Sequence, residues 1–258
     1  MARITLNRPN SLNAFSSEMI DLWIQALETV RNSEEIRVVI ISGNGRGFCA
    51  GGDIKTMAKG NGFLDSDAKE GSSSALDRKN SLWKKIHRVP LTMKEIDKPI
   101  IASLHGFAFG AGFDMALACD IRIAAKSTKI SESYLKVGIV PGDGAAWLLP
   151  RFVGVDQTLD LLWTGKVLTA DEAKEMGLIT HVVDDTQLTT FVSDYAEKLT
   201  KGPQAAIALT KRAVYQGLDM SFKASLDMIS SSMAIVSELD DFHEGVRAIN
   251  ERRSPHFK

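Results

Sequence analysis

Residues 98–120 read KPIIASLHGFAFGAGFDMALACD and combine three patterns. Pro99–Leu104 is a short apolar run, which is typical of a buried strand. Gly106–Gly112 is a turn of small residues with three glycines, and Phe113–Ala118 begins a helix that carries one acid, Asp114. A strand that leads through a glycine-rich turn into a helix N-terminus directs free backbone N–H groups at one point. That geometry suits an anion, or an oxygen that becomes anionic during a reaction.

Glycines that serve packing alone would explain this stretch equally well, but a second, similar turn favours the chemical interpretation. Val38–Ser42 is a β-branched run, typical of a strand buried on both faces. Gly43–Gly47 and then Ala50–Asp53, read AGGD, follow it. Two parallel strands that end in such turns place two N–H donors on either side of one oxygen, and small residues let a carbonyl approach the backbone. Such a pair forms an oxyanion hole, in which each donor contributes roughly 3 kcal/mol in the transition state.

The rest of the chain alternates strands and helices up to about residue 184. Strands are predicted at Arg3–Leu6, Val38–Ser42, Pro99–Leu104, Ile121–Ala125 and Leu178–Val183, and helices at Ser16–Asn32, Leu76–Val89, Gly144–Gly165 and Thr169–Met176. Lys59–Ala75 has no periodicity and is predicted to be a mobile loop. Gln187–Arg253 is predicted to be helical, with breaks at Gly202-Pro203 and near Gly217. This order predicts an α/β core followed by a C-terminal helical region.

The composition excludes several classes of function. The 258 residues carry 31 basic and 32 acidic side chains, so the chain lacks the basic surface that nucleic acid or an anionic membrane attracts. No run is long and apolar enough to cross a membrane, and no signal peptide is predicted. Cys49 and Cys119 lack metal-type spacing and are predicted to be reduced in a cytoplasmic protein. The histidines also lack ligand spacing, so no metal site is expected. Gly43–Gly47 does not match the dinucleotide-binding spacing.

Two segments resemble the signatures of the crotonase, or enoyl-CoA hydratase/isomerase, superfamily: RGFCAGGDIK at residues 46–55 and KPIIASLHGFAFGAGFDMALACDIRIAA at residues 98–125. The likeness extends over nearly the whole chain and includes TLNRPNSLNAF, VGIVPGDGAAWLLPRFVG, TGKVLTADEAKEMGLI and DFHEGVRAINERRSPHF. It implies an α/β spiral of repeated ββα units over residues 1–184, which holds the acyl-CoA site. It also implies that the helices of residues 185–258 trimerise and complete the coenzyme A site. Trimers, or hexamers built from two trimers, are expected.

The resemblance further implies an acyl-CoA thioester substrate, whose carbonyl oxygen is held by the backbone N–H groups of Gly52 and Ala111. Coenzyme A is expected as part of the substrate, with no permanently bound cofactor. The residues implied in binding it are Ala50, Gly52, Asp53, Ile54, Lys55, Gly110, Ala111, Gly142 and Arg252. Lys55 and Arg252, the latter from a neighbouring subunit, would lie near the phosphates. Solvated surface charges are the alternative for both.

The proton-transfer residues depart from the family pattern. Hydratases use two glutamates, and the matching positions here hold Asp114 and Tyr134. Tyrosine has an unperturbed pKa near 10 and is a poor base. Asp143 in the PGDG turn is an additional acid. The resemblance implies that dienoyl isomerase, thioester hydrolase and dehalogenase subfamilies use an acid about one residue away from this point. Glu132, two residues before Tyr134, is a further candidate if it turns inward.

Each candidate also has a structural interpretation. Asp114 would complement a helix dipole, Asp143 would be an N-cap, and Tyr134 would be a half-buried aromatic residue. Glu132 would be a solvated charge, His105 a structural hydrogen-bonding residue, and Trp147 part of the acyl pocket or of the core.

The combined interpretation is an enzyme that hydrates an enoyl-CoA or moves its double bond, with Asp114, Asp143 and Tyr134 as catalytic residues. A thioester hydrolase, dehalogenase or carbon–carbon lyase of the same fold is the first alternative. A coenzyme A-binding protein without catalysis is the second. The acyl group is not specified by the sequence.

Overall fold

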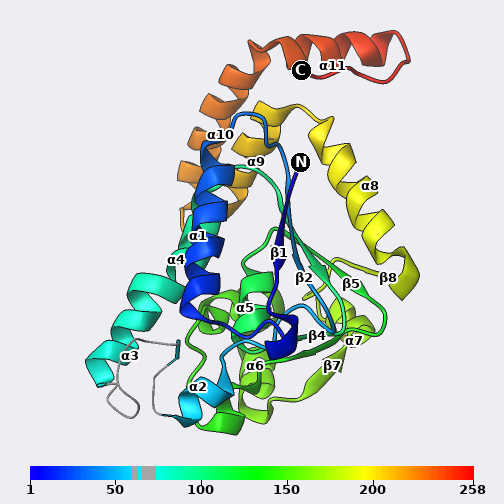
Figure 1. The fold of residues 1–258 in the computed structure, drawn as a ribbon. Helices are drawn as coiled ribbons and strands as arrows, with labels where there is room; N and C mark the ends of the chain where they lie inside the picture. The colour runs from blue at the N-terminus through cyan, green and yellow to red at the C-terminus, as the bar shows by residue number, and fades with distance from the viewer. Residues whose placement is uncertain (60–62, 65–73) are drawn as a thin grey trace.

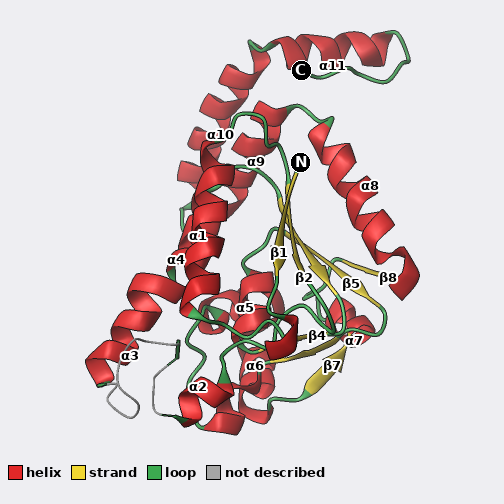
Figure 2. Cartoon of the chain, viewed as in Figure 1, coloured by secondary structure: helices red, strands yellow, loops and turns green. Residues whose placement is uncertain are grey.

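The computed structural model describes residues 1–59, 63–64 and 74–258. Within them the strands form two sheets, drawn in yellow in Figure 2. The larger sheet is parallel and has the order β1 (Ala2–Leu6), β2 (Val39–Gly43), β3 (Ile100–Leu104), β5 (Ile121–Ala125) and β8 (His181–Val183). The smaller sheet contains β4 (Phe107–Phe109), β6 (Lys129–Ser131) and β7 (Val167–Thr169). Thus β4 continues the chain from β3 into a different sheet, directly before the second glycine turn.

Helices surround these sheets. They are α1 (Ser17–Asn32), α2 (Ile54–Ala58), α3 (Ala75–Ser81), α4 (Arg88–Glu95), α5 (Ala111–Leu117), α6 (Ala145–Thr164), α7 (Ala170–Glu175), α8 (Leu188–Thr200), α9 (Gln204–Gly217), α10 (Phe222–Ser237) and α11 (Asp240–Asn250). A π-helical turn, η2 (Leu82–Ile86), joins α3 to α4, and short 3₁₀ turns are η1 (Pro9–Ser11), η3 (Ser133–Val137) and η4 (Asp185–Gln187). Figure 1 shows α8 on one side of the larger sheet and α1 with α4 on the other.

The larger sheet is buried on both faces because its strands send alternate side chains to two separate cores. In and beside β2, Val39 and Ile41 join the main core, which also holds side chains of α1, α4 and α5. Val38 and Ile40 point the other way and pack with Val192 and other residues of α8. Full burial of both faces explains why this strand reads as a continuous apolar run, as the sequence predicted.

The two glycine turns touch each other backbone to backbone. Gly51 has a φ of +84°, and a Cβ atom there would lie 2.7 Å from the carbonyl oxygen of Phe109. A Cβ atom on Gly112 would lie 2.5 Å from the carbonyl oxygen of Cys49. Because no side chain fits between the turns, the end of β2 and the start of α5 approach as closely as main chains can.

Most predicted elements are confirmed, and the differences have local causes. The single helix predicted at Leu76–Val89 is wrong in extent: it runs as α3, the π-helical turn and α4 to Glu95. The strand predicted at Leu178–Val183 begins only at His181, since the Leu178 N–H instead donates to the Ala173 carbonyl oxygen and closes α7. A break between α10 and α11, at the extended residue Leu239, was not predicted.

Other local predictions concern caps and the loop. Thr169 caps α7 as expected, in a capping box with Glu172. The sequence predicted a mobile loop at Lys59–Ala75, but most of this segment, residues 60–62 and 65–73, lies outside the described residues.

The C-terminal helices α10 and α11 extend away from the sheets (Figure 1). No residue of α9 or α10 is buried, although both carry many large apolar side chains. Those that are exposed include Val214, Leu226, Ile229, Met233 and Ile235. The chain alone therefore leaves one apolar face of this region uncovered.

Candidate active site

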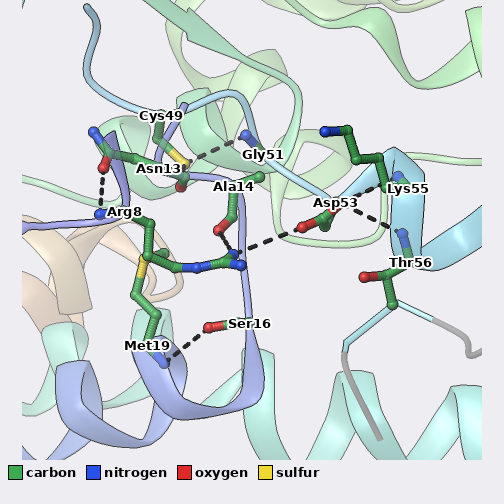
Figure 3. A network of polar contacts seen from close by, with 10 residues as sticks. All are labelled: Arg8, Asn13, Ala14, Ser16, Met19, Cys49, Gly51, Asp53, Lys55 and Thr56. Atoms are coloured by element: carbon green, nitrogen blue, oxygen red, sulfur yellow. Dashed lines mark hydrogen bonds and ion pairs between the residues drawn. The ribbon is translucent and has the colours of Figure 1, made fainter. Parts of the chain in front are cut away.

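Asn13 holds the first glycine turn in place, and Figure 3 shows its side chain beside Arg8. The side chain is fully buried, and its Nδ2 donates to the carbonyl oxygens of Asn44, Gly47 and Phe48 at 2.9–3.0 Å. Its Oδ1 accepts a hydrogen bond from the Arg8 N–H at 2.8 Å. Asn13 lies in the TLNRPNSLNAF segment, and its sequence context predicted no role for it.

Asp53 caps α2 and is tied to the N-terminal segment (Figure 3). Its Oδ1 accepts from the N–H groups of Lys55 and Thr56 at 3.1 and 3.4 Å, and its Oδ2 lies 3.7 Å from Arg8 Nη1. The N–H of Phe15 donates to the Gly51 carbonyl oxygen at 2.8 Å. These contacts fix the direction in which the Gly51-Gly52 peptide faces.

The second turn is fixed by the smaller sheet. The Gly110 N–H donates to the Ser131 carbonyl oxygen at 2.8 Å, and the Phe109 N–H donates to the Cys49 carbonyl oxygen at 3.0 Å. Helix α5 then begins at Ala111. Within the described residues no oxygen accepts a hydrogen bond from the N–H of Gly52 or Ala111. Two unused donors therefore stand on the two turns that touch.

Gly52 and Ala111 line one cavity of about 450 Å³. Most of its wall is apolar and includes Phe15, Ile54, Met57, Leu82, Phe109 and Ile139. Its polar side chains are those of Ser133, Tyr134, Lys136 and Asp143. A largely apolar hollow with a few convergent polar groups is the usual form of a small-molecule site.

Tyr134 bridges two buried carboxyl groups. Its hydroxyl oxygen lies 2.7 Å from Asp114 Oδ2 and 3.0 Å from Asp143 Oδ2. The N–H of Ala145, at the start of α6, also donates to Asp114 Oδ2 at 3.0 Å. A phenol has one proton and can donate to one of the two carboxyl groups only. The other contact needs a proton on the carboxyl group, so at least one of Asp114 and Asp143 is protonated in this arrangement.

Burial and like charge explain where that proton resides. Burial and the neighbouring Asp143 raise the pKa of Asp114 to about 7. Burial also raises the pKa of Asp143, but the Tyr134 hydroxyl and the charge of His87 oppose the rise. The pKa of Glu132 is raised well above its usual range by burial and by Asp114, which its carboxyl group faces. The Tyr134 hydroxyl and His87 thus favour the charged form of Asp143, the carboxyl group that lines the cavity, while burial and Asp143 favour the protonated form of Asp114.

The structure brings most of the predicted site residues together. Those that line the cavity are Ala50, Gly52, Ile54, Gly110, Ala111, Tyr134, Gly142 and Asp143. Asp114 lies behind Tyr134 rather than in the wall, and Asp53 and Lys55 also lie outside the lining. Arg252 follows α11, which Figure 1 shows far from α2 and α5 in the same chain.

Several structural interpretations are corrected. Glu132 is not a solvated charge but is 2% exposed, and Tyr134 is 6% exposed rather than half-buried. Asp143 is not the N-cap of α6, because Gly144 occupies that position and makes no side-chain capping bond. Trp147 lies neither in the cavity nor in the core: it is 43% exposed and stacks on the Arg151 guanidinium group at 3.6 Å.

Two smaller predictions concern histidine and cysteine. His105 Nε2 lies 2.9 Å from the Gly45 carbonyl oxygen, as expected for a structural residue. Cys49 and Cys119 are both buried and free. In the described part of the chain, no cluster of three or more His, Cys, Asp or Glu side chains is arranged to hold a metal ion. No described helix is long and apolar enough to span a bilayer.

The parallel sheet, the two touching glycine turns and the apolar cavity define an α/β enzyme of the crotonase fold. A family model described as enoyl-CoA hydratase/isomerase matches residues 1–258. The chain belongs to this family, which confirms the family predicted from the sequence, and it is an acyl-CoA-processing enzyme.

Individual relatives support the assignment along the full length. A 1,2-epoxyphenylacetyl-CoA isomerase from Escherichia coli strain K12 is 34% identical over 254 residues, which cover 98% of this chain and 93% of that protein. A short-chain-enoyl-CoA hydratase from Clostridium acetobutylicum is 30% identical and covers 98% of this chain and 92% of its own. The crystal structure of an enoyl-CoA hydratase from Bacillus anthracis superposes with a TM-score of 0.89 at 30% identity, over 99% of this chain and 94% of that chain.

Proposed function

We propose that this enzyme moves the double bond of an enoyl-CoA, with Asp143 as the base. One observation carries the choice of isomerisation over hydration. Among the described residues that line the cavity, Asp143 is the one carboxylate. Hydration of the kind that two glutamates perform needs one group for the water and another for the α-carbon. A single carboxylate suffices when one proton is taken from one carbon of the substrate and returned to another.

The thioester carbonyl oxygen would accept hydrogen bonds from the free N–H groups of Gly52 and Ala111. When Asp143 removes a proton from the α-carbon, the electrons of the C–H bond move into a dienolate and its negative charge collects on this oxygen. The two donors stabilise that charge without having to reorganise. Asp143 then returns the proton to the γ-carbon, the electrons leave the oxygen, and the double bond has moved by one position.

Tyr134 and Asp114 would stabilise a single negative charge on Asp143, because Asp114 stays protonated. The Tyr134 hydroxyl donates to ionised Asp143 while protonated Asp114 donates to the Tyr134 oxygen, which satisfies both short contacts. Asp114 then acts through Tyr134 and is not expected to touch the substrate. The largely apolar wall favours an uncharged acyl group, since a second carboxylate there would lose its hydration.

The coenzyme A moiety is proposed to pass along Gly52–Lys55, with Lys55 near its phosphates. Residues 185–258 are proposed to form subunit contacts in a trimer or a dimer of trimers, in which Arg252 of a neighbouring subunit would complete the site. The exposed apolar face of α9 and α10 supports this, because a surface of that kind is usually covered in the assembled protein.

The test is turnover of matched 3-enoyl-CoA and 2-enoyl-CoA thioesters of several chain lengths, followed by the absorbance of the conjugated thioester. Wild-type enzyme should convert the 3-enoyl to the 2-enoyl compound, and Asp143→Asn should lower kcat about 10³-fold with little change in KM. Loss of conjugated absorbance without isomerisation would instead identify a hydratase, and release of free thiol a hydrolase. If Asp143→Asn retained full activity, the assignment of the base would be wrong.

A further inference from the structure

We propose that His87 is a positioning residue for Asp143: its ring anchors the Gly142-Asp143 turn through a hydrogen bond, and its charge acts on the Asp143 carboxyl group. This inference rests on the proposed role of Asp143 as the base. His87 belongs to none of the sequence segments that carry the resemblance to the enzyme family, and it does not line the cavity.

The anchor is a short hydrogen bond to the main chain. His87 Nε2 lies 2.6 Å from the carbonyl oxygen of Gly142, the residue directly before Asp143. A carbonyl oxygen only accepts, so Nε2 carries the proton and donates. The bond joins the helical segment that follows α3 to the PGDG turn, 55 residues further along the chain.

The π-helical turn explains how His87 reaches Gly142. The His87 N–H donates to the Leu82 carbonyl oxygen at 2.9 Å, five residues back. One extra residue in the turn rotates everything after it by about 100° relative to a regular α-helix, and π-helical turns are frequent at functional sites. As a result Leu82 and Ile86 line the cavity while His87 points at the turn that carries Asp143.

The positive charge of His87 acts on a site that contains several acidic groups. The Tyr134 hydroxyl of η3 contacts Asp143 and also Asp114 of α5. The charge of Asp143 raises the pKa of the Asp114 carboxyl group and of the Cys49 thiol. Glu132 faces Asp114 and completes the acidic side. The Tyr134 hydroxyl and the positive charge of His87 oppose the effect of burial, and both lower the pKa of Asp143.

The experiment compares four variants of the full-length enzyme. His87→Gln keeps a donor for the Gly142 carbonyl oxygen but removes the charge, and His87→Leu removes both. Lys84→Gln removes one positive charge from the same turn at an exposed position and is the matched control. Asp143→Asn identifies the signals of Asp143. Thermal unfolding confirms that each variant is folded.

The two His87 variants distinguish the effect of its hydrogen bond to Gly142 from the effect of its charge. His87→Gln should keep its maximal kcat within about threefold of wild type, and the acid limb of its pH profile should move to higher pH, because Asp143 loses the positive charge that lowers its pKa. His87→Leu should show the same shift and a fall in kcat of about 10–100-fold at nearly unchanged KM. Lys84→Gln should match wild type. Wild-type kcat and pH profile in both His87 variants, in an enzyme that Asp143→Asn inactivates, would overturn the inference.

A second readout does not depend on turnover. Infrared difference spectra report the protonated carboxyl band of Asp143, assigned by its loss in Asp143→Asn, across a pH titration. The band should persist to higher pH in His87→Gln than in wild type or Lys84→Gln. If this shift is seen but no enoyl-CoA is converted, the proposed function fails and the role of His87 stands. If the band titrates identically in all three proteins, the role of His87 fails.

Discussion

The fold keeps the carboxyl group of Asp114 protonated until the pH approaches 7, and this lowers the stability of the protein at neutral pH and above. Its pKa is about 7 in the folded protein and near 3.8 in the unfolded chain. Between these values the folded state binds a proton that the unfolded state has released, so the free energy of unfolding decreases as pH rises. The stabilisation that the protonated Asp114 provides is therefore fully present below about pH 4, and it is lost as the pH rises through about 7.

Asp114→Asn removes this titration while keeping the shape of the side chain. We expect it to raise the free energy of unfolding at pH 8 by about 2–4 kcal/mol relative to wild type, and to have much less effect at pH 4. Urea unfolding at the two pH values measures the difference. Asp171→Asn, at an exposed position on α7, serves as the control and should change stability little at either pH. A stabilisation that is the same at pH 4 and pH 8 would contradict the raised pKa.

Tyr134 contributes a single hydroxyl proton to two carboxyl groups. Tyr134→Phe keeps the ring in the buried site but removes the bridge, and the hydrogen bond that lowers the pKa of Asp143 is lost. We expect kcat to fall about 10–100-fold and the acid limb of the pH profile to move to higher pH. A variant with an unshifted profile would show that the hydroxyl does not act on Asp143.

At the scale of the elements, the glycine turns tolerate no added atoms where they touch. Gly112→Ala places a Cβ atom 2.5 Å from the Cys49 carbonyl oxygen, which is main chain and cannot move aside alone. We expect a loss of about 1–3 kcal/mol in the free energy of unfolding, together with loss of activity, because the two N–H donors move apart. Thermal unfolding and kcat measured on the same samples check this.

The control separates crowding from backbone strain. Gly138 has a φ of +73°, and nothing lies within 4 Å of a Cβ atom built there. Gly138→Ala should therefore lower stability by the strain alone, about 1 kcal/mol, with activity retained. Equal losses of activity in the two variants would mean that the close approach of the turns is not what matters.

Sequence reasoning predicted the elements whose signals are local. The β-branched run of β2, the cap at Thr169 and the strand–turn–helix around Gly110 each follow from a few neighbouring residues. The π-helical turn was missed because the bond from the His87 N–H to the Leu82 carbonyl oxygen leaves no mark in the local sequence pattern. Glu132 was misjudged for a similar reason: a lone glutamate usually lies at the surface, and Asp114, which helps to raise its pKa, lies on another element.

At the scale of the whole molecule, the C-terminal helices are the part that a single chain leaves incomplete. Leu226 and Met233 on α10 are 52% and 63% exposed, and helices with such faces usually pack against another subunit. The double variant Leu226→Glu, Met233→Glu should shift the protein toward monomer in multi-angle light scattering, because buried unpaired charges oppose association. Two glutamates on the exposed polar face of α8 should leave the mass unchanged. A monomeric wild type would contradict the proposed assembly.

The tether made by Asn13 has an evolutionary consequence. Its side-chain amide donates hydrogen bonds to the main-chain carbonyl oxygens of residues 44, 47 and 48. Every amino acid carries this carbonyl group, whatever its side chain. A change of side chain at position 44 therefore leaves the hydrogen bond from Asn13 intact. An alanine at position 13, in contrast, would leave all three carbonyl oxygens without this donor. Among related sequences, we expect the asparagine at position 13 to be conserved while the side chain at position 44 varies.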